Sequence, residues 1–250
     1  MSTVAAIDLR TLGCFDNAMN TLTVICAQQP DQAAALWRAE KIHTGLVTDT
    51  VNLEGNPFTL PEVQTLLDGV TVGGHKLADA EQVQNQSASW KTLVDRVRRR
   101  QFRFNQETAC TLNGIVARNE ALAWGTFRNR PVTIAGTAWI PPDAETLHDA
   151  FAALVATLEG IADTHLRAMT AFLTMARHRY FFDGNKRTGR LMMNGMLLTA
   201  GYDVINVPYR RRQAFNTKML HFYDTGEQQD MFAFLLSCST YPKEKPYLAA

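Results

Sequence analysis

A short segment of the chain, residues 177–190, has the composition of an anion-binding loop. It reads RHRYFFDGNKRTGR and combines a glycine, an amide, a carboxylate and several cations. Gly184 permits a tight turn and a close approach of the backbone, and the side chain of Asn185 can donate to a phosphate oxygen. Arg187 and Arg190 are three residues apart, so both would lie on one face of a helix that begins here. The segment therefore predicts a site for the phosphates of a nucleotide.

The first residue of this loop, Asp183, is a hard oxygen ligand of the kind that a phosphate-bound Mg²⁺ requires. The free N–H groups at the start of the second helix would add to the positive potential of the site. The alternative is a connection between two helices with a solvated, charged face. Such a turn needs neither the asparagine nor two aligned arginines, so the binding site is the favoured interpretation.

The elements that must position the loop are helices. Apolar residues recur at helical spacing through most of the chain, which predicts a mainly α fold with a long buried helix directly before the loop. Thr59 and Glu62 have the spacing of a capping box, and Asp143 and Asp163 are expected to cap the helices that follow them. The expected helices cover residues 34–54, 59–67, 77–97, 105–121, 143–158, 163–182, 187–200, 210–224 and 227–238.

One segment breaks the helical pattern. Residues 130–142, RPVTIAGTAWIPP, have β-branched and aromatic residues on both sides of an Ala-Gly pair and prolines at both ends. This pattern predicts a β-hairpin.

Length and composition limit the functional classes. The 250 residues fit one compact unit, and 25 basic against 24 acidic residues give a net charge of +1. With so little net charge, nucleic-acid binding through the arginines of residues 96–103 or 210–212 is not favoured. Four separated cysteines give no metal-ligand spacing, and neither a signal peptide nor a membrane span is apparent. These features predict a cytoplasmic protein.

The loop resembles the signature of the Fic family, HxFx(D/E)GN(G/K)RxxR. Phe181 and residues 183–187 match it in register, as does Arg190, and the LMMNGMLLTAGY that follows is similar to the family as well. The resemblance implies a Fic-type helical bundle, ATP or another nucleotide with Mg²⁺ as ligands, and transfer of AMP to a protein hydroxyl. It implies nucleotide contacts from Gly184, Asn185, Lys186, Arg187, Gly189 and Arg190, with Asp183 at the metal.

A second motif, TVNLEGN at residues 50–56, resembles the family's inhibitory sequence (S/T)xxxE(G/N). Thr50, Glu54 and Gly55 occupy its defined positions. The resemblance implies that Glu54 pairs with Arg190 and competes with the γ-phosphate of the nucleotide for the same guanidinium donors. Alone, EGN would be only a glutamate before a helix-ending glycine.

The catalytic position departs from the family. Two residues before Phe181, where the family has its histidine, this chain has Arg179, which stays protonated and cannot act as a general base. His178 is adjacent, but one residue corresponds to a rotation of about 100° on a helix, so it would serve only if the register shifted. The chain could therefore be an active transferase or a pseudoenzyme that binds nucleotide or protein.

Two further expectations follow from the resemblance. Many nucleotidyl-transferring members have a glycine at the position of Lys186. The lysine here resembles that of the Doc branch, which transfers a phosphoryl group, so phosphoryl transfer stays open as an alternative. The hairpin resembles the family's flap, in which Thr133, Ile134, Ala135, Gly136 and Thr137 would dock an extended segment of a target protein. The expected division is an N-terminal helical region at 1–100, a Fic core at 101–240 and an irregular tail at 241–250.

Overall fold

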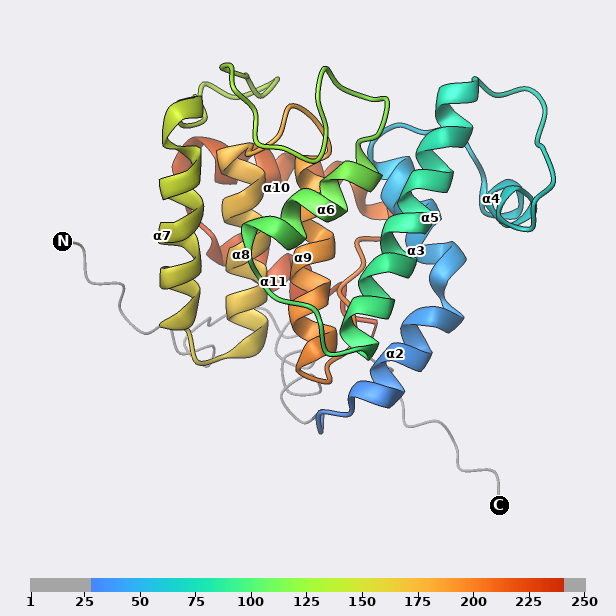
Figure 1. The fold of residues 1–250 in the computed structure, drawn as a ribbon, viewed down its shortest axis with the longest axis horizontal. Helices are drawn as coiled ribbons and strands as arrows, with labels where there is room; N and C mark the ends of the chain where they lie inside the picture. Colours follow the sequence, from blue (N-terminus) through green and yellow to red (C-terminus); the bar gives the residue numbers. More distant parts are fainter. Residues whose placement is uncertain (1–27, 241–250) are drawn as a thin grey trace.

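The computed structural model describes residues 28–240 (Figure 1). Helices dominate this part of the chain, so the predicted mainly α class is confirmed, and the only β-pairing within it is an isolated bridge between Ile205 and Ser239. The expected absence of a signal peptide at the N-terminus and the irregular tail at 241–250 lie outside the described residues.

Two antiparallel helices form the centre of the bundle, α8 (Thr164–His178) and α9 (Asn185–Thr199). Asp163 caps α8 as predicted, because its carboxylate accepts from the backbone N–H of Leu166 at 2.7 Å. The two helices make the most extensive interhelical contact in the described chain. Gly189 permits this approach, since a Cβ there would lie 3.1 Å from the Phe172 ring on α8.

The N-terminal helices cover one side of this pair. They are α2 (Gln32–Lys41), α3 (His43–Leu53), α4 (Leu60–Leu67) and α5 (Leu77–Arg98). A single helix over residues 34–54 was expected, but the chain breaks at Ile42. The break allows α2 to contact α9 while α3 packs against α5. The capping box of Thr59 and Glu62 is confirmed at the start of α4.

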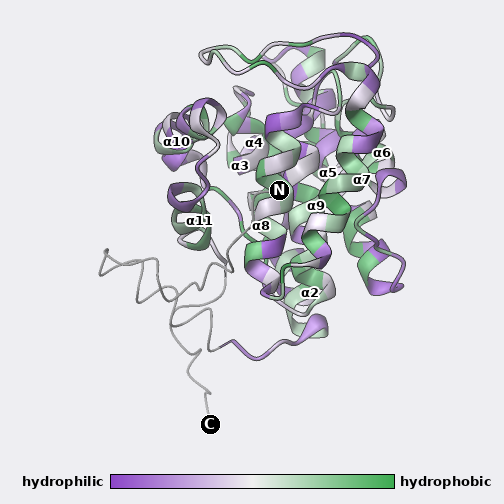
Figure 2. Ribbon diagram, turned by 90° about the vertical axis from the view of Figure 1, so that its left-hand side faces the viewer, coloured by the Kyte–Doolittle hydropathy of each residue, from purple (hydrophilic) through white to green (hydrophobic). Residues whose placement is uncertain are grey.

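The remaining helices complete the bundle. The short α6 (Gln106–Val116) crosses the front of α9 in Figure 1, α7 (Leu147–Glu159) packs beside α8, and α10 (Arg212–Thr225) and α11 (Gln229–Leu236) lie behind. Single turns of 3₁₀ helix, η2 (Ala144–Thr146) and η3 (Tyr209–Arg211), precede α7 and α10. Figure 2 shows α10 and α11 as a layer separate from the central helices.

The expected β-hairpin over residues 130–142 is not confirmed. This segment is an irregular loop with one turn at Ala135 and Gly136. Its polar groups find other partners: the backbone N–H of Ala138 donates to Asp224 on α10, and that of Trp139 donates to the hydroxyl of Thr137. A backbone whose N–H groups are satisfied in this way does not need cross-strand pairing.

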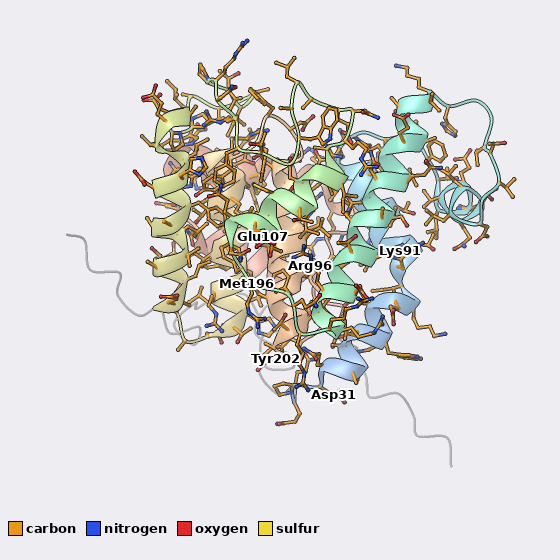
Figure 3. All side chains as sticks on the ribbon, in the orientation of Figure 1. Asp31, Lys91, Arg96, Glu107, Met196 and Tyr202 are labelled. Atoms are coloured by element: carbon orange, nitrogen blue, oxygen red, sulfur yellow. The ribbon has the colours of Figure 1, made fainter. Side chains whose placement is uncertain are left out.

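The loop between α8 and α9 lies at the upper end of the bundle in Figure 1, beneath the long connection from α6 to α7. Side chains fill the spaces between α5, α6 and α9, which Arg96, Glu107 and Met196 mark in Figure 3. These packed helices support the predicted anion loop at one end of the bundle.

None of the described helices is long and apolar enough to span a bilayer.

Candidate functional site

The loop between α8 and α9 has a backbone that only glycine fits. Gly184 has φ 72° and directly precedes α9. A Cβ at this position would lie 3.1 Å from side-chain atoms of Asn113, Val116 and Ala117. The positive φ and this close contact together explain the glycine. This conformation of Gly184 also places the free N–H groups of the first turn of α9 at the end of the loop.

Asn113 on α6 anchors the loop through hydrogen bonds, and no sequence motif predicted this role. Its Nδ2 donates to the carbonyl of Asp183 at 3.0 Å and to the hydroxyl of Thr188 at 3.2 Å. Its Oδ1 accepts from the backbone N–H of Gly125 at 3.0 Å. The amide is fully buried. An asparagine among the apolar residues of a helix is the sequence signal that could have revealed it.

Asn185 closes the loop on itself. Its Oδ1 accepts from the backbone N–H of Phe181 at 2.9 Å, and its Nδ2 donates to the carbonyl of the same residue at 2.7 Å. The sequence predicted a phosphate contact from this side chain. In the structure its amide is instead buried and joined to the loop backbone.

Arg187 is held by a carboxylate on the far side of the loop. Its two Nη atoms each lie 2.7 Å from an oxygen of Glu120, and Nη1 also donates to the carbonyl of Val116. The side chain is only 3 % exposed. This fork-to-fork ion pair saturates one edge of the guanidinium, and Arg187 does not line the cavity described below.

Arg190 meets a different carboxylate, as the resemblance implies. Oε1 of Glu54 lies 3.2 Å from Nη2 of Arg190, and Oε2 of the same carboxylate lies 3.0 Å from Nζ of Lys186. Nε and Nη1 of Arg190 are buried and have no hydrogen-bond partner in the described part of the chain. Glu54 therefore bridges two cations and leaves part of the Arg190 guanidinium unsatisfied.

The charge of Glu54 is stabilised by this environment. Burial alone would raise the pKa of the carboxyl, but Lys186, Arg190 and Arg187 outweigh that effect and lower the pKa to about 2. Glu54 is thus ionised at neutral pH, as an internal competitor of a phosphate must be.

A cavity of about 280 Å³ lies beside these cations. Its walls come from the loop, from residues 134–135 and from α10; they are Ile134, Ala135, Arg179, Lys186, Asn216, Met219, Leu220 and Tyr223. The hydroxyl of Tyr223 and Nε of Arg179 are buried and have no partner among the described residues. Burial also raises the pKa of Tyr223 to about 12, so its hydroxyl remains a donor at neutral pH. Unpaired donors beside a cavity favour an anionic ligand.

Arg179 occupies the left-handed region, with φ 52° and ψ 61°, and ends α8. Its carbonyl accepts from Nε of the buried Arg128 at 2.6 Å. His178 does not line the cavity. Its ring is stacked on Tyr180, and its Nδ1 lies 2.9 Å from the carbonyl of Thr174. The register shift that would bring His178 to the catalytic position is therefore not present.

The expected flap, residues 133–137, is fastened to α10. Thr137 donates its hydroxyl proton to the Asp224 carboxylate, which also accepts from the backbone N–H of Ala138. Ile134 is buried in a core formed by apolar residues of α8, α9, α10 and α11, whereas Thr133, Ala135 and Gly136 are exposed. Trp139, two residues after this segment, has its ring centre 3.6 Å from the guanidinium carbon of Arg177. The segment thus lies over the cavity without being a strand.

Asp183, the expected metal ligand, has a half-exposed carboxylate at the mouth of the loop. Its Oδ1 accepts from the backbone N–H of Gly184 at 2.6 Å and lies 3.8 Å from Nη2 of Arg187. Within residues 28–240 no cluster of three or more His, Cys, Asp or Glu side chains could hold a metal ion. One carboxylate fits Mg²⁺ that arrives with phosphates and keeps several waters.

The other predicted residues have structural surroundings. Thr50 is buried on α3, one turn before Glu54, and Gly55 follows it with φ 97°. Gly189 faces Phe172 and not the cavity.

The basic runs are partly neutralised by other groups. Arg98 and Arg99 pair with Glu40 and Asp95, and Arg211 donates to Ser237 and Cys238.

The comparisons with known proteins identify the fold and the family of the loop. Residues 103–197 match the Fic/DOC family. Over 93 % of its length the chain is 26 % identical to the protein adenylyltransferase Fic of Drosophila ananassae and 25 % identical to that of Drosophila melanogaster. The chain spans 46 % of the length of each of these relatives.

Two solved structures have the same fold. Fic-1 of C. elegans (residues 134–508) superposes with a TM-score of 0.75 at 20 % identity, covering 94 % of this chain and 70 % of the other. A Fic domain containing signaling protein from Bacteroides thetaiotaomicron superposes with a TM-score of 0.70 at 21 % identity, covering 89 % and 92 %. The anion loop lies inside the segment that matches the Fic/DOC family, and the fold around it is that of the two solved Fic structures.

Proposed function

We propose that the chain binds ATP with Mg²⁺ at the loop of residues 183–190, that Glu54 inhibits this binding, and that AMP transfer by the usual base-catalysed route does not follow. The observation that carries the proposal is the bridge of Glu54 between Lys186 and Arg190. A carboxylate placed on these cations occupies the position that a ligand phosphate would take, because both offer charged oxygens to the same donors.

The charges beside the cavity support a polyphosphate ligand. Arg179 and Lys186 line the cavity, and Glu54 bridges Lys186 to Arg190, so three cations and one carboxylate meet here. Removal of Glu54 would leave the buried guanidinium of Arg190 and the ammonium of Lys186 without their carboxylate partner, which is costly unless an anion replaces it. Phosphate oxygens would also satisfy Nε and Nη1 of Arg190, which have no partner within the described chain.

The metal would come with the nucleotide. Asp183 is the available carboxylate at the mouth of the loop, and Mg²⁺ held by one carboxylate and by phosphates would offset the charge of the ligand. The N–H groups at the start of α9 face the same region and favour a phosphate there. In this arrangement Asn185 and Arg187 shape the loop, whereas Lys186 and Arg190 contact the ligand.

The absent proton acceptor is the reason for expecting little AMP transfer. A target hydroxyl must lose its proton as it attacks a phosphate, and Arg179 at the family's histidine position is already protonated. Tyr223 retains its own proton because its pKa is raised to about 12. His178 is turned toward Thr174 and Tyr180. Arg179 and Tyr223 can bind or orient an anion, but none of the three groups accepts a proton at neutral pH from within the cavity.

Two alternatives belong to the same site. The relatives are named adenylyltransferases, which favours transfer of AMP. In that alternative a target protein would dock against residues 133–137. Lys186, which resembles the Doc branch, favours phosphoryl transfer instead. The ion pair between Lys186 and Glu54 gives this lysine a role in inhibition under either alternative.

Calorimetry with ATP and Mg²⁺ tests the binding proposal. The unmodified chain is expected to bind weakly, and Glu54→Gly is expected to bind about tenfold more tightly, since coupling between competing sites is commonly 1–3 kcal/mol. Glu40→Gly, which removes an exposed glutamate from α2, is the control and should leave the affinity unchanged. The absence of binding by both the unmodified chain and Glu54→Gly would contradict the proposal.

Radiolabel transfer separates the alternatives. ATP labelled at the α- or the γ-phosphate is supplied to Glu54→Gly and to Glu54→Gly/Arg179→His. We expect α-label on protein only with the double variant, because only that variant has a base. Transfer of α-label by Glu54→Gly would establish an active adenylyltransferase, and transfer of γ-label would favour the phosphoryl reaction.

A further inference from the structure

Gln82 on α5 joins two parts of the site through the two ends of its amide. Its Nε2 donates to Oε2 of Glu120 at 3.0 Å, and its Oε1 accepts from Nδ2 of Asn56 at 3.0 Å. Glu120 holds Arg187, and Asn56 follows Glu54 by two residues. A row of polar contacts therefore connects the first turn of α9 with the turn that carries the inhibitory carboxylate.

This amide has a single favourable orientation. The carboxylate of Glu120 can only accept, and Nδ2 of Asn56 can only donate. If the amide of Gln82 rotated by 180°, its oxygen would face a carboxylate and its NH₂ would face another NH₂. Both contacts would become repulsive, so the two partners fix the side chain and the side chain fixes their separation.

The other contacts of Asn56 show how the turn is anchored. Its Nδ2 also donates to the carbonyl of Asp79 at 2.9 Å, and its Oδ1 accepts from the backbone N–H of Phe58 at 3.1 Å. Its own carbonyl accepts from Nδ2 of Asn52 at 2.7 Å. Asn56 is buried, whereas the neighbouring Gly55 is exposed and has no side chain to pack. Asn56 is thus the point that fixes the end of α3.

The contact of Glu54 with Arg190 is sensitive to small shifts of this turn. Its 3.2 Å separation is at the long end of the usual range for an N–H···O hydrogen bond. A further displacement of a few tenths of an ångström would weaken it substantially. The anchoring of Asn56 therefore decides whether the carboxylate reaches the guanidinium.

We propose that Gln82 is a positioning residue for inhibition: by linking Asn56 to Glu120, it holds Glu54 in register with Arg190. The proposal rests on the proposed binding of nucleotide at the loop and adds a residue whose side-chain hydrogen bonds go to Asn56 and Glu120 and which does not line the cavity. When Gln82 is lost, Arg187 keeps its pair with Glu120 and Asn56 keeps its bond to Asp79. The fold is expected to persist while the inhibitory turn loosens.

The test variant is Gln82→Met, which preserves the length of the side chain and removes both hydrogen bonds. A matched control is Asn85→Leu, one turn further along α5. Asn85 donates to the carbonyl of Arg118, two residues before Glu120, but has no hydrogen bond to the turn of Glu54 in the described structure. Gln82→Glu is a second test variant, because it would repel Glu120 while still accepting from Asn56.

The first measurement is amide hydrogen exchange of residues 54–56 by mass spectrometry, with no nucleotide present. The N–H groups of Gly55 and Asn56 donate to the carbonyls of Asn52 and Val51 in the closed turn. We expect severalfold faster exchange in Gln82→Met and Gln82→Glu, and unchanged exchange in Asn85→Leu. Unchanged exchange in both Gln82 variants would overturn the proposal.

The second measurement is a double-variant cycle of ATP·Mg²⁺ affinity. Gln82→Met should tighten binding about threefold in the unmodified chain and should have no effect in Glu54→Gly, where no carboxylate remains to be positioned. An equal effect in both backgrounds would refute action through Glu54. If neither background binds nucleotide, the proposed function fails, and the exchange measurement still decides whether Gln82 holds the turn.

Discussion

Two arginines on one turn of α9 have opposite environments. Arg187 and Arg190 are both almost fully buried, at 3 % and 6 % side-chain exposure. Arg187 has two 2.7 Å contacts with Glu120 and a third with a backbone carbonyl. Arg190 has one 3.2 Å contact with Glu54, and two of its nitrogens have no partner in the described part of the chain.

The difference shows that burial alone does not identify a binding group. A buried guanidinium whose donors are satisfied is part of the framework, whereas one with unsatisfied donors is stable only because a ligand or a substitute for a ligand compensates it. Glu120 is thus a framework partner of Arg187, which we call permanent, and under the proposed function Glu54 is an exchangeable partner of Arg190.

The largest expected effect comes from breaking the permanent pair. Glu120→Ala removes a partner of Gln82 and leaves the buried Arg187 with only the half-exposed carboxylate of Asp183, 3.8 Å away, as a counter-charge. We expect a loss of about 3 kcal/mol in the free energy of unfolding, as for other buried pairs that lose one member. Urea unfolding followed by circular dichroism measures it.

The control for that experiment is Glu120→Gln, which preserves the shape and one acceptor oxygen and should lose less stability. If Glu120→Ala lowered the free energy of unfolding by no more than the surface variant Glu40→Ala, the pair would not be part of the framework. The contrast between the two arginines would then be lost.

The second prediction compares Arg190→Lys with Arg187→Lys, both in the Glu54→Gly background. Lysine keeps the charge but lacks the planar fork that holds phosphate oxygens. Arg190→Lys should weaken ATP·Mg²⁺ binding about tenfold, which corresponds to about 1.4 kcal/mol. Arg187→Lys should leave affinity within about threefold and lower the melting temperature instead. Calorimetry and thermal unfolding of the two proteins give both quantities, and equal losses of affinity would show that both arginines contact the nucleotide.

The distinction between these arginines was not accessible from the sequence. Their spacing predicts a shared helix face, and that much is local geometry. Glu120 lies 67 residues before Arg187 and belongs to no recognisable motif. Its pairing with Arg187 arises only because α6 packs against α9. Glu54 was predicted because its motif resembles a known one, and the structure places it at 3.2 Å from Arg190.

Other features divide in the same way. The mainly α fold and the capping box at Thr59 follow from local periodicity and spacing, and both are confirmed. The hairpin was expected from β-branched residues around a glycine, but side chains such as Asp224, distant in sequence, satisfy the backbone there. Asn185 was expected to contact a phosphate, but its buried side-chain amide forms hydrogen bonds with the backbone of Phe181 instead. Local chemistry was predictable, and the partners supplied by distant segments were not.

The smallest predicted effect concerns the pH dependence of the exchangeable pair. The pKa of Glu54 is held at about 2 in the folded chain, below its ordinary value of 4.5. A carboxyl with a lowered folded pKa contributes stability above its unfolded pKa and loses it as pH falls toward the folded pKa. The difference in unfolding free energy between the unmodified chain and Glu54→Gln should therefore be constant near pH 7 and narrow between about pH 5 and pH 2.

Urea unfolding at several pH values provides this comparison, with Glu40→Gln as the control. Glu40 forms an ion pair with Arg98 in which both side chains are about half exposed, so its removal should change stability little at any pH, as for most exposed pairs. The difference in unfolding free energy between the unmodified chain and Glu54→Gln could instead stay the same down to pH 2. That result would mean that Arg190 and Lys186 do not stabilise the charge of Glu54. In that case the carboxylate would not act as a substitute for a phosphate, and the distinction between a permanent and an exchangeable partner would have to be abandoned.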